Sequence, residues 1–287
     1  MNARLLFVHA LSPLHAGAGQ GIGVIDQPTI REKATNLPYL PGSSLKGALR
    51  DACPTHNRTR IFGPDPANAS DHAGAAQFSD QRLLLLPVRS LAGTFAWVTS
   101  PLILTRFARD VIDTGTDRAK LPAIPRSQDP AACFVGTFNT AITLPAREGR
   151  QVVLEDLDLQ ATTDDIISMW SEWLGTRLFP GDAEWQAMLG ERLCVVHDDV
   201  LTFLLTTATE VIARVRLMSE TKTVAQGGLW YEEALPAETI LSGLLLAMPV
   251  AAAVDEVFAI IEDLTRSTIQ LGGGATVGRG LCRVQLV

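Results

Sequence analysis

Apolar residues along the chain gather in compact runs that alternate with polar, Gly- or Pro-containing stretches. Compact runs bounded by turn residues predict buried strands. We expect such strands at residues 4–11, 82–90, 94–100, 151–161, 201–218, 240–248 and 281–287. Apolar residues that recur every three or four positions instead predict helices. We expect helices at residues 43–53, 101–113, 163–179, 182–190 and 254–271.

Three of the predicted helices begin at residues with a known preference for helix starts. Ser43 and Thr163 stand where a hydroxyl can accept a hydrogen bond from the first turn. Pro101 stands at a first helical position, where its missing N–H is not needed. The starts of these helices are therefore predicted from chemistry as well as from periodicity.

The segments between these elements are long. We expect an exposed loop at 54–80, an insertion at 114–150 and a β-hairpin at 216–238 that turns at Gly227–Gly228. Residues 12–42 form a further loop with four glycines between residues 17 and 23. A loop of this length in a compact domain is typically functional.

The order of the predicted elements indicates the fold class. The chain begins with strand, loop and helix, and it ends with strand, helix, Gly-rich loop and strand. Such ends fit an α+β fold with a ferredoxin-like (RRM-like) βαββαβ core, in which the first and last strands lie near each other in one sheet. We therefore expect one domain over residues 1–287, with large insertions and a protruding hairpin.

Composition and cysteine usage exclude several classes of protein. The chain is 47% hydrophobic and 19% charged, which is typical of a globular domain. The longest apolar stretch, residues 240–254, is interrupted by Gly243 and Pro249, so we expect a cytoplasmic protein with no membrane partner. The four cysteines form no C-x-x-C pair and the histidines lack zinc-ligand spacing, so buried free thiols are expected. His9 stands within an apolar strand and is expected to be a core histidine whose ring nitrogens are satisfied by hydrogen bonds.

Charge is distributed unevenly along the chain. The net charge is −7, but residues 1–60 hold seven Lys or Arg against three Asp or Glu, and residues 264–287 hold three Arg and no acid. The central part of the chain is therefore strongly acidic. If the two chain ends lie together in the sheet, they build a basic face that suits a phosphate-bearing partner.

The glycine-rich stretch GGGATVGRG at 272–280 follows a helix and precedes a strand. A dinucleotide-binding fingerprint has the reverse order, so that function is excluded. The glycines either cap the helix and form a turn or let a phosphate chain approach the backbone closely. Arg279 lies inside the loop and favours the second interpretation. Gly272, Gly273, Gly274 and Arg279 are therefore candidate RNA-binding residues.

The predicted helix at 43–53 provides a second candidate anion site. The free N–H groups at its start, near Ser43 and Ser44, favour negative charge, and Lys46 and Arg50 share one face because they are four residues apart. A solvated surface would use such a pair too. Further cations close by in sequence, including Arg31 and Lys33, favour an extended RNA strand as the partner.

Asp26 is the only carboxylate in the first 31 residues. It could be a turn-forming residue before Gln27-Pro28, or it could bind Mg²⁺ or Mn²⁺ while a substrate phosphate supplies other ligands. His15 lies on the same loop and has a side chain suited to acid–base chemistry near neutral pH. We take Asp26 and His15 as candidate catalytic residues, and Asp26 as the candidate metal ligand.

Four stretches carry a resemblance to a known family: SPLHAGAGQGIGVIDQPTIREKATNLPYLPGSSLKGALR, FSDQRLLLLPVRSLAGTFAWVTSPLIL, LWYEEALPAET and LGGGATVGRG. They resemble the backbone subunits of type III-B CRISPR RNA-guided (Cmr) effector complexes, in the RAMP superfamily. The resemblance implies an RRM-like palm, a helical filament of several copies along a guide RNA, and contacts with the other subunits of the complex.

The same resemblance implies metal-dependent cleavage of a complementary target RNA, and Asp26 matches the catalytic aspartate of the family. It assigns residues 216–238 to a thumb hairpin that reaches a neighbouring copy, so Met218 and Lys222 become candidate RNA contacts. Glu232 or Glu233 could enter the catalytic site from the thumb of an adjacent copy.

Three other functions stay open on the sequence. The chain could be a filament protein that holds guide RNA without cutting, or a metal-free RNA-processing nuclease of the same superfamily that works through histidines. A small-molecule enzyme is the remaining alternative, although no cofactor motif is found.

Overall fold

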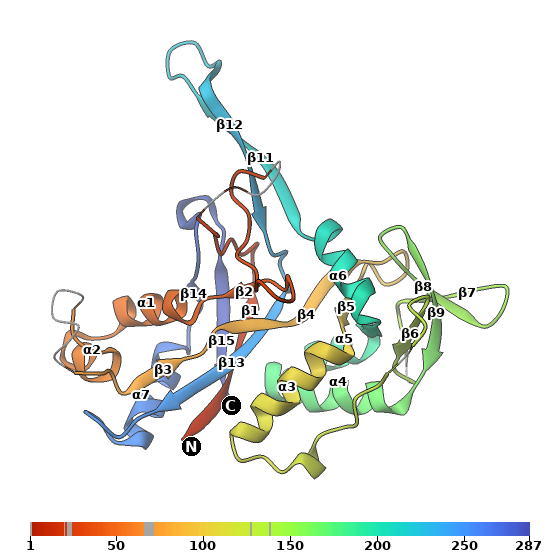
Figure 1. Ribbon diagram of the computed structural model, residues 1–287, viewed down its shortest axis with the longest axis horizontal. Coiled ribbons are helices and arrows are strands. Elements are labelled where there is room, and N and C mark those ends of the chain that lie inside the picture. Colours follow the sequence, from red (N-terminus) through yellow and green to blue (C-terminus); the bar gives the residue numbers. More distant parts are fainter. Residues whose placement is uncertain (1, 20, 22–24, 66–71, 127, 138) are drawn as a thin grey trace.

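The computed structural model describes residues 2–19, 21, 25–65, 72–126, 128–137 and 139–287 (Figure 1). Its helices are α1 Gly42–Ala52, α2 Thr55–Phe62, α3 Pro101–Asp113, α4 Asp165–Leu178, α5 Ala183–Arg192, α6 Asp198–Thr207 and α7 Val254–Leu264, with short 3₁₀ turns η2 Arg118–Lys120 and η3 Ala275–Val277. Its strands are β1 Ala3–Ala10, β2 Tyr39–Leu40, β3 Ala76–Phe78, β4 Gln81–Arg89, β5 Phe95–Thr99, β6 Ala132–Val135, β7 Thr143–Pro145, β8 Arg150–Leu154, β9 Leu157–Thr163, β10 Leu193–Val196, β11 Glu210–Leu217, β12 Val224–Ala234, β13 Ile240–Ala247, β14 Ile269–Gln270 and β15 Leu281–Leu286.

The described strands form a 13-stranded, mostly antiparallel sheet and a separate two-stranded hairpin. The sheet follows the order β14-β15-β1-β13-β4-β5-β10-β6-β9-β8-β7, while β2 pairs with β4 and β3 pairs with β13. The hairpin of β11 and β12 projects away from the sheet, as Figure 1 shows. The structure thus confirms the expected mixed α+β class.

The first strand of the chain lies inside the sheet. β1 pairs antiparallel with β13 on one side and with β15 on the other. Beyond the ladder, Leu5 and Val287 exchange two backbone hydrogen bonds of 3.0 and 2.9 Å. Residues 5–10 are all buried, and because successive side chains point to opposite faces, both faces of β1 must be covered. The prediction that the two ends of the chain share one sheet is confirmed.

The second half of the sheet, from β5 to β7, carries α4 and α5. Trp97 of β5 and Trp170 of α4 are fully buried. The indole N–H of Trp170 donates a hydrogen bond of 2.8 Å to the carbonyl of Ala123, as buried tryptophans usually require. The helical stripe predicted at 163–179 therefore faces the core.

Two predicted helix caps differ from the structure. The side chain of Asp164, not Thr163, accepts the hydrogen bond from Ile166 N–H at the start of α4. At the start of α1 no neighbouring hydroxyl acts as a cap. Instead Asp80, distant in sequence, accepts the Gly42 N–H at 2.9 Å.

We expect Asp80→Ala to lower the free energy of unfolding by about 1 kcal/mol, the usual loss when a cap is removed. Urea denaturation followed by circular dichroism measures this difference. Asp80→Asn keeps a side-chain oxygen as acceptor and serves as the control. Equal stability of Asp80→Ala and the unmodified protein would contradict the capping role.

Several segments expected to be loops or strands have a different structure. The predicted loop at 54–80 contains α2 and β3, and its residues 66–71 lie outside the described residues. The predicted insertion at 114–150 contributes β6 and β7 to the sheet. The predicted strand at 201–218 is helix α6 followed by β11, and that at 151–161 is the hairpin of β8 and β9.

The hairpin turn is also displaced from the prediction. Leu217 pairs with Val224, and Met218 and Thr223 are joined by a backbone hydrogen bond, so the chain turns at 218–223. Gly227 and Gly228 lie within β12, where the register shifts opposite residues 215–217. The two glycines therefore belong to an irregular stretch of β12, where the regular pairing with β11 is interrupted.

The expectation for the cysteines is confirmed, whereas His9 is buried as expected but its Nδ1 has no hydrogen-bond partner among the described residues. All four cysteines are free and buried, and burial raises the pKa of the Cys282 thiol to about 12. His9 is 6% exposed, and its Nε2 lies 2.5 Å from Oε2 of Glu238. In the described part of the chain, no helix combines the length and apolar character needed to cross a bilayer.

Candidate functional site

The base of the projecting hairpin organises the loop that follows β1. One edge of β12 pairs with β11. The other edge, here called the hairpin-base edge (residues 231–235), binds the N-terminal loop (residues 11–38). Leu14 and Leu235 exchange backbone hydrogen bonds of 2.8 and 2.9 Å, Gln27 N–H donates to Tyr231 O at 3.0 Å, and Glu233 N–H donates to Gln27 O at 2.9 Å. Two distant parts of the N-terminal loop are thereby attached to one strand (Figure 1).

Asp26 lies at the outer end of this edge. Its side chain is exposed, and its Oδ2 accepts a hydrogen bond of 2.8 Å from the Tyr231 N–H. This contact fixes one carboxylate oxygen on a backbone donor. The carboxylate is thus held in place without being buried, as a ligand for a cation or a substrate must be.

His15 lies at the inner part of the same edge. Its Nδ1 is 2.6 Å from the carbonyl oxygen of Glu233, and its own carbonyl accepts a hydrogen bond of 2.9 Å from Gly273 N–H. The residues that hold Asp26 and His15, Tyr231 and Glu233, are two apart on one strand, which corresponds to roughly 7 Å. The fold therefore attaches the two predicted catalytic residues of the loop to the same strand edge.

Glu233 is a buried centre of this arrangement. Its side chain is 5% exposed, and its Oε1 accepts from Arg31 Nη2 at 2.6 Å while its Oε2 accepts from Thr29 N–H at 2.9 Å. Arg31 also donates to the carbonyl of Leu205 at 3.0 Å. Both charges are thus satisfied within the chain, as buried ions require.

Glu232 forms a second buried cluster with the glycine-rich tail. Its carboxylate lies 3.6 Å from Arg214 Nε on β11 and 3.4 Å from Arg279 Nε. Burial raises the pKa of nearby Glu210, and the positive charge of Arg279 acts in the opposite direction. This cluster joins both hairpin strands to the tail.

These contacts correct several expectations for site residues. Glu232 and Glu233 were expected to approach the site from a neighbouring copy, but here both carboxylates are buried and bound to arginines of their own chain. The guanidinium of Arg31 is engaged by Glu233, and Arg279 is 6% exposed, so neither is a free surface cation. The basic chain ends do converge, but much of their charge is neutralised within the chain.

The glycines of the tail have a structural explanation. Gly272 adopts a φ of +71°, and a Cβ at this position would lie 2.3 Å from the carbonyl oxygen of His15. Gly274 has a φ of +76° and packs against the side chain of Arg279. Glycine is needed at 272 both for the backbone conformation and for close approach to His15. Gly273 also contacts the N-terminal loop, because its N–H donates a hydrogen bond to the carbonyl of His15.

The remaining predicted RNA-binding residues lie on the surface. Ser43 and Ser44 are exposed at the start of α1, where Lys46 helps to line a cavity of about 480 Å³. The first N–H of this helix is already bound by the carboxylate of Asp80, and Arg50 pairs with Asp65 at 2.7 Å. Fewer donors and positive charges are therefore free to bind an anion here than the sequence predicted. Lys33 is exposed on the N-terminal loop, and Met218 and Lys222 are exposed at the hairpin tip.

Sequence reasoning did not find Arg214 or Thr29, which complete the buried clusters. Arg214 is diagonal to Glu232 across the hairpin, since Ile212 is the direct partner of Glu232. Diagonal neighbours on one face of a hairpin are within reach of long side chains. The pair would be a usable sequence signal only if the hairpin register were known.

Comparisons with known proteins show the family of the chain. Residues 7–283 match the RAMP superfamily. The chain belongs to that superfamily. It is 35% identical over 296 residues to "CRISPR system Cmr endoribonuclease Cmr4" of Pyrococcus furiosus, which covers 100% of this chain and 96% of the relative. It is 24% identical to "CRISPR system CMR subunit Cmr4" of Saccharolobus solfataricus, over 97% and 94% of the two chains.

Solved structures of superfamily members have the same fold over the whole chain. The crystal structure of oligomeric Cmr4 from Pyrococcus furiosus matches with a TM-score of 0.76 and 29% identity, over 100% of this chain and 98% of that chain. A chain of the type III-B Cmr-beta complex bound to cognate target RNA matches with a TM-score of 0.75 at 20% identity, over 99% and 96% of the two chains. The fold of this RAMP protein is thus an established one.

Asp26 of this RAMP protein presents an exposed carboxylate that is held by one backbone hydrogen bond. Within the described ranges, no group of three or more His, Cys, Asp and Glu side chains could hold a metal ion. Magnesium, however, commonly uses one or two protein carboxylates and takes its other ligands from water and substrate phosphates. An exposed carboxylate with one oxygen bound to a backbone donor fits that kind of site.

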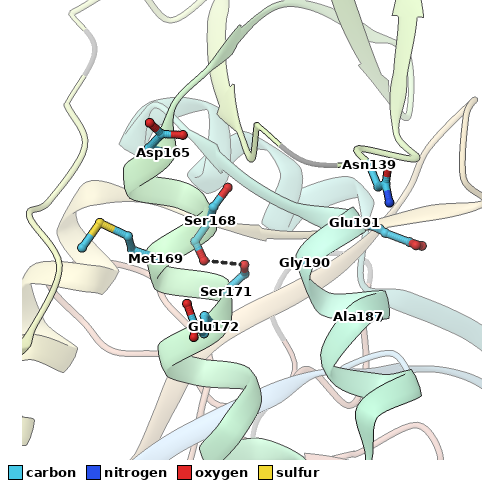
Figure 2. Close-up of a pocket in the computed structure, with 9 residues that line it drawn as sticks. All are labelled: Asn139, Asp165, Ser168, Met169, Ser171, Glu172, Ala187, Gly190 and Glu191. Atoms are coloured by element: carbon cyan, nitrogen blue, oxygen red, sulfur yellow. Dashed lines mark hydrogen bonds between the residues drawn. The ribbon is translucent and has the colours of Figure 1, made fainter.

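A separate cavity of about 590 Å³ lies between α4 and α5 (Figure 2). Three carboxylates of its lining, those of Asp165, Glu172 and Glu191, give it an acidic character. Ser171 Oγ donates a hydrogen bond of 2.8 Å to Ser168 O at its wall. None of the residues that line the cavity belongs to the hairpin-base edge or to the N-terminal loop, so the candidate site of this RAMP protein is distinct from it.

Proposed function

We propose that this RAMP protein is a backbone subunit of a type III-B CRISPR interference complex, and that it binds guide RNA and cleaves complementary target RNA. The Pyrococcus relative, 35% identical over the full length, is named an endoribonuclease of the Cmr system. The observation that supports cleavage by this chain is the exposed carboxylate of Asp26, held by Tyr231 N–H on the same hairpin-base edge that holds His15.

We propose a ferredoxin-like palm as the platform of this site. Four neighbouring strands of the sheet run in the order β15-β1-β13-β4, and α1 and α7 contact each other beside them. This order and the two helices are what a βαββαβ core requires. The hairpin of β11 and β12 would then be the thumb, with Met218 and Lys222 at its tip for RNA.

Asp26 would hold the divalent metal, Mg²⁺ or Mn²⁺, together with oxygens from RNA and water. Such a metal stabilises negative charge that develops on the phosphate. Tyr231 N–H holds Oδ2 of Asp26, and the residue itself is exposed. His15, half-buried on the same edge, would move a proton during cleavage.

The proposed partners are a guide RNA, a target RNA, further copies of the chain and the other subunits of the complex. The exposed tip residues Met218 and Lys222 and the cavity beside Lys46 support contacts with RNA. The oligomeric crystal form of the Pyrococcus relative supports self-association. Lys33 has no ion-pair partner among the described residues and is available for a phosphate.

Copurification tests this function directly. The protein, isolated from its host with its partners, is expected to carry a discrete short RNA and to cut a complementary RNA added in trans. With EDTA, cutting is expected to stop and to return when Mg²⁺ or Mn²⁺ is added in excess.

The controls separate the alternatives. An RNA without complementarity should stay intact in the same preparation. A complex that carries RNA but never cuts would support the non-cleaving filament, and cutting that persists in EDTA would support the metal-free nuclease. Absence of any copurified RNA, with partners present, would contradict both the proposal and these alternatives.

A further inference from the structure

Gly17 of the N-terminal loop is not explained by backbone conformation. Residues other than glycine are strained in the left-handed region, but the φ of Gly17 lies outside that region. Its neighbours are fixed, since Ile30 N–H donates to Ala16 O at 2.7 Å and Ala18 N–H donates to Pro28 O at 3.0 Å. The backbone at this position would therefore accept alanine. What separates alanine from glycine at this position is the space for the side chain. A Cβ on residue 17 would lie 2.9 Å from Nε2 of His15.

The tautomer of His15 follows from its partner. A peptide carbonyl accepts hydrogen bonds and cannot donate one, so the contact of 2.6 Å with Glu233 O requires a proton on Nδ1. In the neutral ring the lone pair is then on Nε2. The carbonyl itself is held in position, since the side chain of Glu233 is bound by Arg31 and Thr29 N–H.

We propose that Gly17 is an access-determining residue, which leaves Nε2 of His15 open to the RNA, and that Glu233 is a positioning residue, which fixes the ring through Nδ1. The proposal rests on the RNA cleavage proposed above. It replaces the sequence expectation that Glu233 takes part in catalysis directly. It also gives a function to the first of the four glycines in the N-terminal loop.

The proton transfer through Nε2 is balanced as follows. A hydroxyl oxygen, from the RNA or from water, forms a bond to phosphorus and gives its proton to Nε2. The departing ribose oxygen leaves with the electron pair of the broken P–O bond and takes a proton from water. A methyl group at position 17 would block Nε2, or it would push the ring away and break the contact with Glu233 O.

The test is a double-mutant cycle in the copurified complex. His15→Asn keeps a side-chain N–H near the position of Nδ1 and removes Nε2. Single-turnover cleavage rates and target-RNA affinities are measured for Gly17→Ala, for His15→Asn and for the double variant. Gly190→Ala is the matched control, because its Cβ would meet Ser171 Oγ at an ordinary 3.7 Å, on the helix beside the separate cavity.

We expect Gly17→Ala to slow cleavage at least tenfold with RNA affinity within twofold of the unmodified complex, and Gly190→Ala to cut normally. Acid–base groups usually contribute about 100- to 10,000-fold, so His15→Asn should lose at least that lower amount. The double variant should be no slower than His15→Asn alone, because Gly17→Ala acts only through Nε2. Additive losses, or a normal rate for Gly17→Ala, would overturn the proposal.

Two-bond ¹H–¹⁵N correlation spectra of the full chain provide a readout that does not depend on activity. The His15 imidazole, assigned by its loss in His15→Asn, is expected to carry its proton on Nδ1 when neutral. A proton on Nε2 would also overturn the proposal. Cleavage by the unmodified complex separates the two hypotheses: if it does not cut complementary RNA, the proposed function fails, whereas if it cuts and Gly17→Ala cuts at the same rate, only this inference fails.

Discussion

Asp26→Asn is expected to reduce target cleavage at least about 1,000-fold while target-RNA affinity changes less than twofold. The substitution removes the charge that would bind the metal, a contribution of several kcal/mol to the barrier, and 1.36 kcal/mol corresponds to tenfold in rate. The amide oxygen of asparagine can still accept the Tyr231 N–H. The N-terminal loop should therefore keep its place. Single-turnover cleavage in the copurified complex, with affinity measured in EDTA, checks both parts.

Asp26→Ala is the informative comparison. It removes both the charge and the hydrogen bond to Tyr231. If Asp26→Ala is less stable than Asp26→Asn, the difference measures how much this hydrogen bond stabilises the N-terminal loop. If Asp26→Asn cut at the rate of the unmodified complex, the chemistry would have to lie elsewhere on the chain.

The second large effect is on stability. Glu233→Ala is expected to lower the free energy of unfolding by about 3 kcal/mol, because removing one partner of a buried ion pair leaves the other charge uncompensated. The side chains of Glu233 and Arg31 are 5% and 14% exposed. Urea denaturation of the isolated chain measures the change.

Glu256→Ala is the matched control for Glu233→Ala. Glu256 also binds an arginine, Arg60, at 2.8 Å, but the two side chains are 38% and 43% exposed. Exposed pairs contribute at most about 1 kcal/mol. In the double variant Glu233→Ala/Arg31→Met the loss should be smaller than the sum of the single losses. Equal effects of Glu233→Ala and Glu256→Ala would contradict the proposed buried centre.

The elements that the sequence predicts well are those whose pattern is local. Helix α3 begins at Pro101 and ends at Asp113 as predicted, and Ser100 Oγ accepts the hydrogen bond of its first turn. Strand β1 is predicted from its continuous apolar run. The run is continuous because the protein covers both faces of this strand. In such segments, local chemistry and tertiary packing favour the same structure.

The errors occur where local pattern and packing differ. Helix α2 buries only Ile61 and Phe62, both at its end, so it has no apolar stripe to detect. Helix α6 contains the run LTFLL, which read alone is typical of a strand. The glycine pair in β12 was interpreted as a turn, although Lys222, with a φ of 55°, is at the turn.

The sequence indicated several residues of the candidate site but not the contacts that join them. The sequence indicated Asp26, His15 and the glycine-rich tail because loops with isolated polar residues stand out from an apolar chain. It could not indicate that Glu232 and Glu233 are buried, since two acids at the end of a strand normally suggest exposure. Burial there depends on Arg31, Arg214 and Arg279, which arrive from three distant segments.

The central place of β1 has a consequence for synthesis on the ribosome. Both of its sheet neighbours, β13 and β15, are encoded more than two hundred residues later. At typical translation rates of 5–20 residues per second, roughly 10–50 s separate the emergence of β1 from that of β13. During that interval the nascent chain exposes an unpaired apolar strand, so its productive maturation should depend on cellular chaperones more than that of proteins whose neighbouring strands are consecutive.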